Sequence, residues 1–271
     1  MQTMNRVRRG TAAVVMIGAT TAAACGISTQ QEIEMGTQYA SQINSELPIV
    51  DDAAANRYIN ALGQELAAQS RRQQIGYRFY IVNSDVVNAF AVPGGYIYIN
   101  RGLIEATDDM SELAGVMAHE IAHVEERHSV EQLERAQGAN LGLTLAYVLL
   151  GRQPSGAERA LIDVGGGLYF SSHSRDAERE ADAVAVPMLV DAGITPNGLV
   201  TFFQELLSQQ NSSPGAVGQW FSTHPTTQER IEDVRAMIAQ QPSSRLRGLQ
   251  TTSNAYQNFK ANLRRYPAPP R

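Results

Sequence analysis

The pentapeptide His119-Glu120-Ile121-Ala122-His123 constrains the fold of this chain more than any other feature. Two histidines four residues apart lie on one face only if the segment is helical, and both imidazoles can then bind one metal ion. Glu120 lies beside them, where its carboxylate can accept a proton from water. Asp109 is suited to cap this helix. The sequence therefore predicts a helix near residues 110–136 that carries metal ligands, the alternative being two surface histidines on an ordinary helix.

A catalytic zinc site needs a third protein ligand and an open position for water. The acidic run at residues 176–182 places Glu178 and Asp182 at helical spacing. One carboxylate can bind the metal while the other accepts the free ring N–H of a ligating histidine. From spacing alone Glu180 competes with Glu178 as the ligand. A solvated helical face is the alternative interpretation of this run.

Composition excludes several other kinds of protein. The 22 basic and 27 acidic residues give a formal net charge of −5, which disfavours nucleic acid as a partner. The chain has a single cysteine, Cys25, so an internal disulfide and a cysteine-based zinc site are excluded. Metal ligands must therefore come from histidine and carboxylate side chains.

The N-terminal segment is typical of a secretion signal. Residues 1–24 combine three arginines with a short apolar stretch and small residues before Cys25. This end resembles a bacterial lipobox, in which the thiol of Cys25 receives a diacylglycerol, and residues 25–30 would then form a lipid-anchored linker. Gly26 resembles the residue found in lipoproteins sent to the outer membrane. A plain secretory signal with a chance cysteine is the alternative.

The periodicity of apolar residues predicts a mainly helical α+β fold with a small β-sheet. A Pro-Gly-Gly turn separates two short apolar runs and predicts a hairpin. Helices are expected near residues 31–45, 51–70, 110–136, 176–191, 196–210 and 225–240, and strands near 77–82, 88–92 and 96–99.

Other segments carry weaker expectations. The apolar stretch 141–150 is too short to cross a membrane and is expected to be a buried helix. Residues 208–218 are expected to form a mobile loop, and Pro187 to kink or break its helix. Residues 245–271 are expected to be a polar, partly ordered C-terminal arm that follows a domain over residues 31–244.

Three motifs together resemble a known family. His119-Glu120-x-x-His123, Glu178-x-x-x-Asp182 and the run of residues 88–97 are similar to zinc metallopeptidases of the HtpX and CAAX prenyl protease class, and specifically to their soluble periplasmic lipoprotein branch. The similarity covers roughly residues 33–240. It implies a zincin-like metallopeptidase domain in which Glu178 is the third zinc ligand and Asp182 orients a ligating histidine. The tandem helical repeats of some relatives are expected to be absent.

The same resemblance draws attention to His224, which precedes a proline. His224 would donate to the oxyanion of the reaction, or occupy the fourth position on zinc and hold the enzyme latent; a helix-entry role before Pro225 is the alternative. His128 and His173 are expected to be surface or outer residues, with His128 pointing away from the metal.

A substrate peptide is expected to add as a strand along Asn88, Ala89 and Phe90. Alternatively, these residues merely end and pack their own strand.

These features predict a zinc-dependent endopeptidase of the bacterial envelope, with one Zn²⁺ per chain. Its substrates would be misfolded or misassembled envelope proteins, and its position would be periplasmic, lipid-anchored, at the inner leaflet of the outer membrane. A zinc-stabilised chaperone or outer-membrane assembly factor is the alternative. The oligomeric state stays open.

Overall fold

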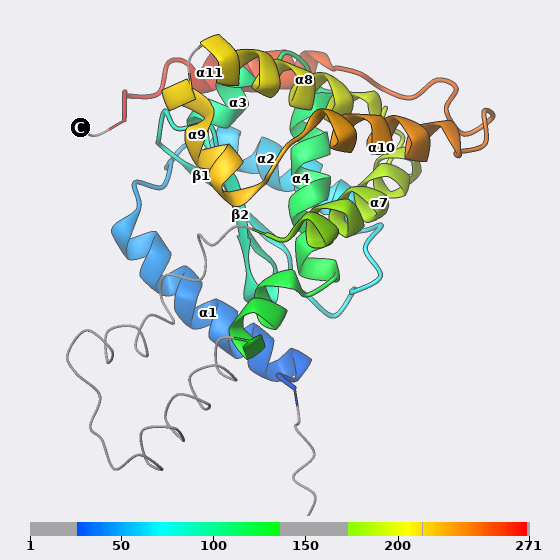
Figure 1. The fold of residues 1–271 in the computed structure, drawn as a ribbon. Coiled ribbons are helices and arrows are strands. Elements are labelled where there is room, and N and C mark those ends of the chain that lie inside the picture. Colours follow the sequence, from blue (N-terminus) through cyan, green and yellow to red (C-terminus); the bar gives the residue numbers. More distant parts are fainter. Residues whose placement is uncertain (1–25, 136–172, 213, 270–271) are drawn as a thin grey trace, which may run out of the picture.

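The computed structural model describes residues 26–135, 173–212 and 214–269 (Figure 1). The described helices are α1 (Thr29–Glu46), α2 (Ala53–Ala67), α3 (Arg101–Ala106), α4 (Met110–Glu125), α7 (Arg175–Asp191), α8 (Asn197–Ser212), α9 (Pro214–Thr223), α10 (Gln228–Ala239) and α11 (Asn254–Leu263). The strands are β1 (Arg78–Val82), β2 (Ala89–Val92) and β3 (Tyr96–Asn100), and a short 3-10 turn, η1 (Pro93–Gly95), joins β2 to β3. The expected mainly helical α+β architecture is confirmed.

The sheet has the order β1-β3-β2, with β3 parallel to β1 and antiparallel to β2. The expected hairpin is therefore present, and Gly94 and Gly95 in its turn adopt positive φ angles of 77° and 87°. Because side chains alternate across a strand, the two faces differ in composition. One face carries alanine, isoleucine and Phe79, and the other carries mainly tyrosine, valine and Phe90.

Helices cover both faces of this sheet. The Phe79 face packs against α2 and α4 within the main core. The Phe90 face packs against Ala40 and Ile43 of α1 and against Leu47, which follows that helix. Figure 1 shows α1 running along the opposite side of the strands from α4. A Cβ atom at Gly36 would lie 2.0 Å from the carbonyl oxygen of Pro93, so this glycine permits α1 to touch the η1 turn.

Helix α4 is the central element of the fold, because every one of its residues is buried. It packs against α2, α7 and α8. The side chain of Asp109 caps its start, as expected, by accepting hydrogen bonds from Ser111 N and Glu112 N. The expectation of one helix over 110–136 is wrong, because α4 ends at Glu125 and a second helical segment starts at residue 128. Between them Arg127 has a φ of 64°.

The C-terminal segment is not a loose arm. Helix α11 contacts α2 and α3, and Tyr256, Phe259 and Leu263 are buried in the main core. The Tyr256 hydroxyl lies 2.9 Å from Thr107 Oγ1, and the Ser253 side chain caps the helix. The expected boundary at residue 244 is therefore corrected: the packed core continues through α11.

Two further expectations are corrected. The segment expected as a mobile loop over residues 208–218 lies mostly within α8 and α9, and Val217 and Trp220 anchor α9 in the core. Helix α7 continues through Pro187 to Asp191, so the expected break is wrong, whereas a kink there stays a prediction. The predicted signal peptide, Cys25 and the apolar stretch 141–150 lie outside the described residues.

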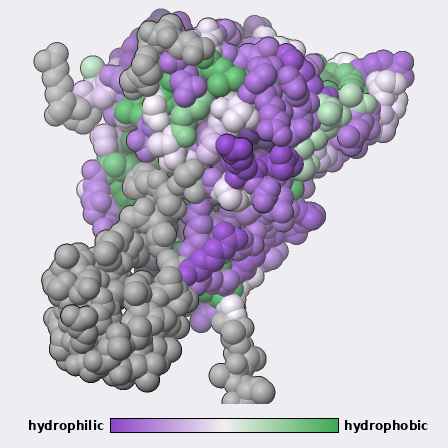
Figure 2. All heavy atoms as spheres, in the orientation of Figure 1, coloured by the Kyte–Doolittle hydropathy of each residue, from purple (hydrophilic) through white to green (hydrophobic). Residues whose placement is uncertain are grey.

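The visible face of the molecule in Figure 2 is mostly hydrophilic, with apolar residues in scattered groups. Among the helices of the described ranges, none combines the length and apolar character needed to cross a membrane.

Candidate active site

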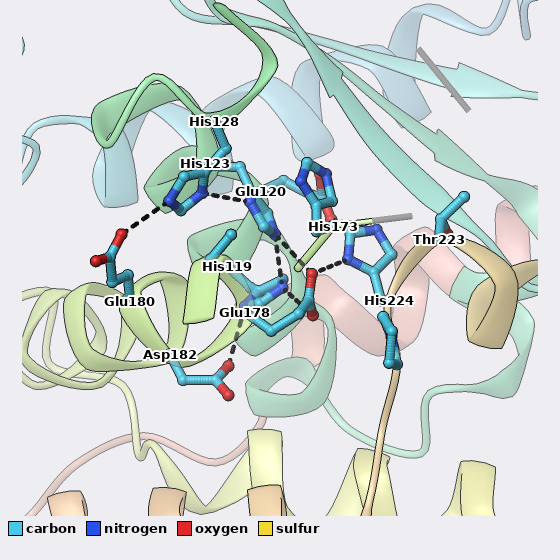
Figure 3. A network of polar contacts seen from close by, with 12 residues as sticks. His119, Glu120, His123, His128, His173, Glu178, Glu180, Asp182, Thr223 and His224 are labelled. Carbon is cyan, nitrogen blue, oxygen red and sulfur yellow. Dashed lines mark hydrogen bonds and ion pairs between the residues drawn. The ribbon is translucent and has the colours of Figure 1, made fainter. Parts of the chain in front are cut away.

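Two packed helices bring the predicted ligands together (Figure 3). Helix α4 supplies His119, Glu120 and His123, and α7 supplies Glu178 and Asp182. The carboxylate oxygens of Glu178 lie 3.4 Å from His119 Nε2 and 3.4 Å from His123 Nε2. The two Nε2 atoms are 3.0 Å apart, and all these side chains are buried. Nitrogen and oxygen lone pairs thus converge on one point.

His224 reaches the same point from another part of the chain. It follows α9, and its ring lies 4.6 Å from the Trp220 ring, in a stacked orientation. His224 Nδ1 is 3.1 Å from Glu178 Oε1, and Nε2 is 3.5 Å from Glu120 Oε1. One ligand atom from each of four buried residues lies within 4.8 Å of the others; these residues are His119, His123, Glu178 and His224. Three imidazoles and a carboxylate form a donor set that suits a divalent transition metal.

Glu120 provides an independent sign that something else belongs in the site. Its Oε1 atom is buried and has no hydrogen-bond partner among the described residues, although it is 3.5 Å from His224. A buried oxygen without a partner is costly. Burial raises the pKa of the Glu120 carboxyl above its usual value, which suits a group that accepts and returns a proton. The residues present therefore fit a metal with a water beside Glu120.

Asp182 and Arg230 support the His119 side of the site. Asp182 Oδ1 is 3.0 Å from His119 Nδ1, which is the geometry expected for an outer carboxylate that orients a ligating imidazole. Arg230 forms two hydrogen bonds with this carboxylate, at 2.6 and 2.9 Å, and also donates to Glu178 Oε2. The side chain of Thr227 caps α10 by accepting from Arg230 N, so the start of this helix places the guanidinium.

The buried charges compensate one another. Burial raises the pKa of Asp182, but Arg230 and His119 together lower it more, so the carboxyl has a pKa below its usual range. Burial also raises the pKa of Glu178, but its contacts with Arg230 and three histidines together lower it well below its usual value. Burial lowers the pKa of His123 well below its ordinary value. Glu178 and Asp182 are therefore ionised acceptors. Their contacts outweigh burial and the charge of Arg230 and raise the pKa of His119 to about 9, so metal binding must displace a proton from this imidazole.

All five histidines of the chain gather here, including His128 and His173, which lie outside the donor set. His128 Nδ1 is 2.8 Å from His123 Nδ1, and His128 Nε2 is 3.2 Å from Glu180 Oε2. The His173 ring stacks on that of His123 at 4.0 Å. The expectation that His128 points away is wrong because the helix on which it was calculated ends at Glu125.

The comparison with known proteins gives the family. Residues 53–238 match the model of peptidase family M48. The chain belongs to this family. It is 33% identical over 224 residues to the β-barrel assembly-enhancing protease of Escherichia coli O157:H7, which covers 79% of this chain and 45% of that protein. It is 31% identical over 176 residues to the metalloprotease LoiP of Escherichia coli (strain K12), covering 65% of this chain and 66% of LoiP.

The chain thus spans about half the length of the β-barrel assembly-enhancing proteases that it matches. Another relative, the metalloprotease YcaL of Escherichia coli (strain K12), is 26% identical over 208 residues, or 77% of this chain and 76% of YcaL. The resemblance to zinc metallopeptidases and the expected fold class are both confirmed.

In this M48 domain β2 is an edge strand, since its only strand neighbour within the described sheet is β3. Asn100 N donates to Asn88 O at 3.0 Å. Because antiparallel pairing alternates, the backbone groups of Asn88 and Phe90 face β3 and those of Ala89 and Ala91 face the other way. Thr223 Oγ1 donates to Asn88 Oδ1 at 3.4 Å, which links the start of β2 to the residue before His224.

Sequence reasoning left part of this M48 site unassigned. The two hydrogen bonds from Arg230 to Asp182 could not be derived from the sequence, because they depend on how α10 packs on α7. Spacing alone left Glu180 as a competitor of Glu178 for the third ligand. The structure places Glu178 in the donor set and Glu180 beside His128, with 65% of its side chain exposed.

Proposed function

We propose that this chain is a zinc-dependent endopeptidase of the bacterial cell envelope that hydrolyses peptide bonds in misfolded or misassembled envelope proteins. The observation that carries the proposal is the buried Oε1 atom of Glu120, which has no hydrogen-bond partner in the part of the chain that the structure describes and lies beside a set of metal-ligand atoms. A site that served only to hold the fold together would have no use for such a carboxylate.

His119, His123 and Glu178 would hold the zinc. The two Nε2 atoms are 3.0 Å apart, close enough to bind one ion together with Glu178. Zinc, when bound, supplies a Lewis acid that polarises the scissile carbonyl and makes water acidic enough to attack near neutral pH. Asp182 keeps the His119 ring in position by accepting from Nδ1.

Glu120 would move the protons. Its Oε1 atom accepts the proton of the attacking water and returns it to the amine that leaves. Burial has already raised the pKa of this carboxyl, so the proton is held more strongly than on an ordinary glutamate. Since Glu120 and His224 are 3.5 Å apart, both side chains face the space where the scissile bond would lie.

His224 would have one of two roles, and its position supports both. As a donor, its ring N–H would stabilise the oxyanion that forms on the substrate carbonyl. As a fourth ligand, it would close the site and hold the enzyme latent. Replacement by alanine separates them: lower activity with unchanged zinc affinity supports the donor, and higher activity with weaker zinc binding supports the latch. Unchanged activity and affinity would contradict both.

The backbone of the substrate would pair with β2. Ala89 and Ala91 direct backbone groups away from β3, although Ser129 Oγ already donates to Ala91 O at 3.4 Å. An extended peptide added at this edge would pass beside Asn88 and approach the residues around His224. A structure with a bound peptide analogue tests this; an analogue that contacts no backbone atom of residues 88–92 would contradict it.

The envelope location and the substrate class rest on the leader sequence and on the names of relatives, one of which is a β-barrel assembly-enhancing protease. Lipidation at Cys25 would anchor the chain at the inner leaflet of the outer membrane. Labelling with radioactive palmitate in a bacterial host tests the anchor. The wild type should incorporate label that a Cys25→Ala variant does not, and equal labelling would contradict the lipid anchor.

One observation favours a second candidate, a zinc-stabilised chaperone or assembly factor with little proteolysis. With His224 the donor set offers four protein ligands, and closed four-ligand sites are usually structural. In that case Glu120 would have no chemical role.

The variant Glu120→Gln separates the two candidates. It keeps the shape of the side chain but removes the group that accepts the proton. For an endopeptidase, cleavage of an unfolded protein such as casein should fall by at least about 100-fold while stoichiometric zinc stays bound. The exposed Glu34→Gln is the matched control and should cleave like the wild type. Unchanged cleavage by Glu120→Gln would contradict the proposed reaction.

A further inference from the structure

We infer that His128 and Glu180 form a positioning chain that holds the metal ligand His123 with its Nε2 lone pair free for zinc. Two distances define the chain: 2.8 Å between the Nδ1 atoms of His123 and His128, and 3.2 Å between His128 Nε2 and Glu180 Oε2. The inference rests on the proposed zinc site and names residues for which that proposal gives no role.

The direction of each hydrogen bond follows from the acceptor at the outer end. An ionised carboxylate only accepts, so His128 Nε2 must donate to Glu180. An uncharged imidazole with its proton on Nε2 has only an acceptor at Nδ1, so His123 Nδ1 must be the donor in the contact between the two rings. His123 Nε2 is then left without a proton, and it faces Glu178 and His119.

The geometry of the two rings agrees with a hydrogen bond and not with packing alone. Their planes cross at 69° and their centroids are 4.9 Å apart, so they meet at their edges. The side chain of His128 is 4% exposed. A polar ring buried this deeply needs a partner at each nitrogen, and both partners are present.

The end of helix α4 at Glu125 brings His128 to this place. Had α4 continued, a residue five positions after His123 would lie about 140° around the helix. Instead the helix ends, and Arg127 adopts a φ of 64° that non-glycine residues rarely use. Arg127 Nη1 pairs with the buried carboxylate of Glu32 at 2.9 Å, and α1 thereby holds the turn that returns His128 to His123.

The test is zinc affinity, measured for the purified chain by competition with a chelator. His128→Leu should weaken zinc binding by about 10- to 100-fold, the usual effect of losing an outer partner of a ligand. His128→Asn should recover part of this loss, because its Oδ1 atom can accept from His123 Nδ1. Glu180→Gln should weaken binding by only about threefold, since Glu180 is largely exposed.

Matched controls separate positioning from damage to the fold. Glu131 is exposed, lies in the same helical segment as His128 and forms an ion pair with Arg135. The control variant Glu131→Gln removes this charge and should bind zinc like the wild type. Thermal unfolding without metal should be similar for His128→Asn, Glu180→Gln and the wild type. If His128→Leu fails to fold, His128→Asn and Glu180→Gln still test the positioning role of His128 and Glu180.

Nuclear magnetic resonance of the ¹⁵N-labelled histidines supplies a second readout. With zinc bound, His123 should carry its proton on Nδ1 and His128 on Nε2, and the His123 signal should shift in His128→Asn. Unchanged zinc affinity in His128→Leu, no recovery in His128→Asn, or a proton on Nδ1 of His128 would each overturn the inference. A wild type that binds no zinc would contradict the proposed function and this inference together, whereas tight binding that is lost in His123→Ala but kept in His128→Leu would contradict the inference alone.

Discussion

His119 and His123 are one turn apart on α4, yet their outer ring nitrogens meet different surroundings. His119 Nδ1 contacts a carboxylate directly, and this carboxylate, Asp182, is buried and held by Arg230. His123 Nδ1 contacts a second imidazole, and the carboxylate behind it, Glu180, is mostly in solvent.

The difference shows two ways of holding an imidazole. On the His119 side the support is a buried ion pair, whose loss would leave charge without compensation in a medium of low polarity. On the His123 side the charge lies at the exposed end, where water and salt screen it. We therefore expect the first support to resist changes of solution conditions and the second to respond to them.

The largest expected effect is a loss of stability when the Arg230 guanidinium on the His119 side is removed. Arg230→Leu leaves the carboxylates of Asp182 and Glu178 without their partner, and should lower the free energy of unfolding of the metal-free protein by about 3–5 kcal/mol. Urea unfolding with and without zinc measures this, and zinc should restore part of the loss because it brings positive charge. Arg179→Leu, on the exposed face of α7, should change little. Equal effects of the two variants would show that Arg230 does not compensate buried charge.

A smaller effect is expected from Asp182→Asn. The variant keeps an oxygen near His119 Nδ1 but loses the charge, so zinc affinity should fall by about 10- to 100-fold. This loss should exceed that of Glu180→Gln on the other side, measured by the same chelator competition. Asp191→Asn, at the exposed end of α7, is the control and should bind like the wild type. An equal loss in Asp182→Asn and Glu180→Gln would remove the distinction between the two sides.

The smallest expected effect is a different response to salt of the His119 and His123 sides of the site. The difference in zinc affinity between Glu180→Gln and the wild type, about threefold at low ionic strength, should nearly vanish at about 0.5 M salt. The difference between Asp182→Asn and the wild type should persist, because Asp182 is buried. Titrations at two salt concentrations measure both. Loss of the Asp182 difference in salt would mean that solvent reaches that side as well.

The sequence predicted the parts of the site that depend on local spacing. The two histidines at i and i+4, and Glu178 with Asp182 one turn apart, follow from the helical repeat. The cap at Asp109 follows from its short acceptor side chain. Helices α4 and α7 present them as expected. The hairpin could be predicted because Gly94 and Gly95 adopt backbone angles that glycine favours.

The remaining parts depend on contacts between distant segments. The end of α4 cannot be inferred from the residues around Arg127, because its unusual backbone angle is held by Glu32 of α1. The position of His128 could not be predicted from the sequence for the same reason. Helix α11 is different, since Tyr256, Phe259 and Leu263 recur at helical spacing; this signal was in the sequence, but the polar residues between them concealed it.

The contribution of α1 and α11 to the core has a practical consequence for anyone who wishes to produce this domain. The family match covers residues 53–238, and cutting there would remove both helices. In such a fragment Arg72 and Arg127 would lose their ion pairs with Glu32. The apolar surface that Tyr256, Phe259 and Leu263 of α11 now cover would be exposed to solvent. Aggregation in the expression host is the expected fate of that shorter polypeptide, so cloning boundaries should enclose residues 26–269.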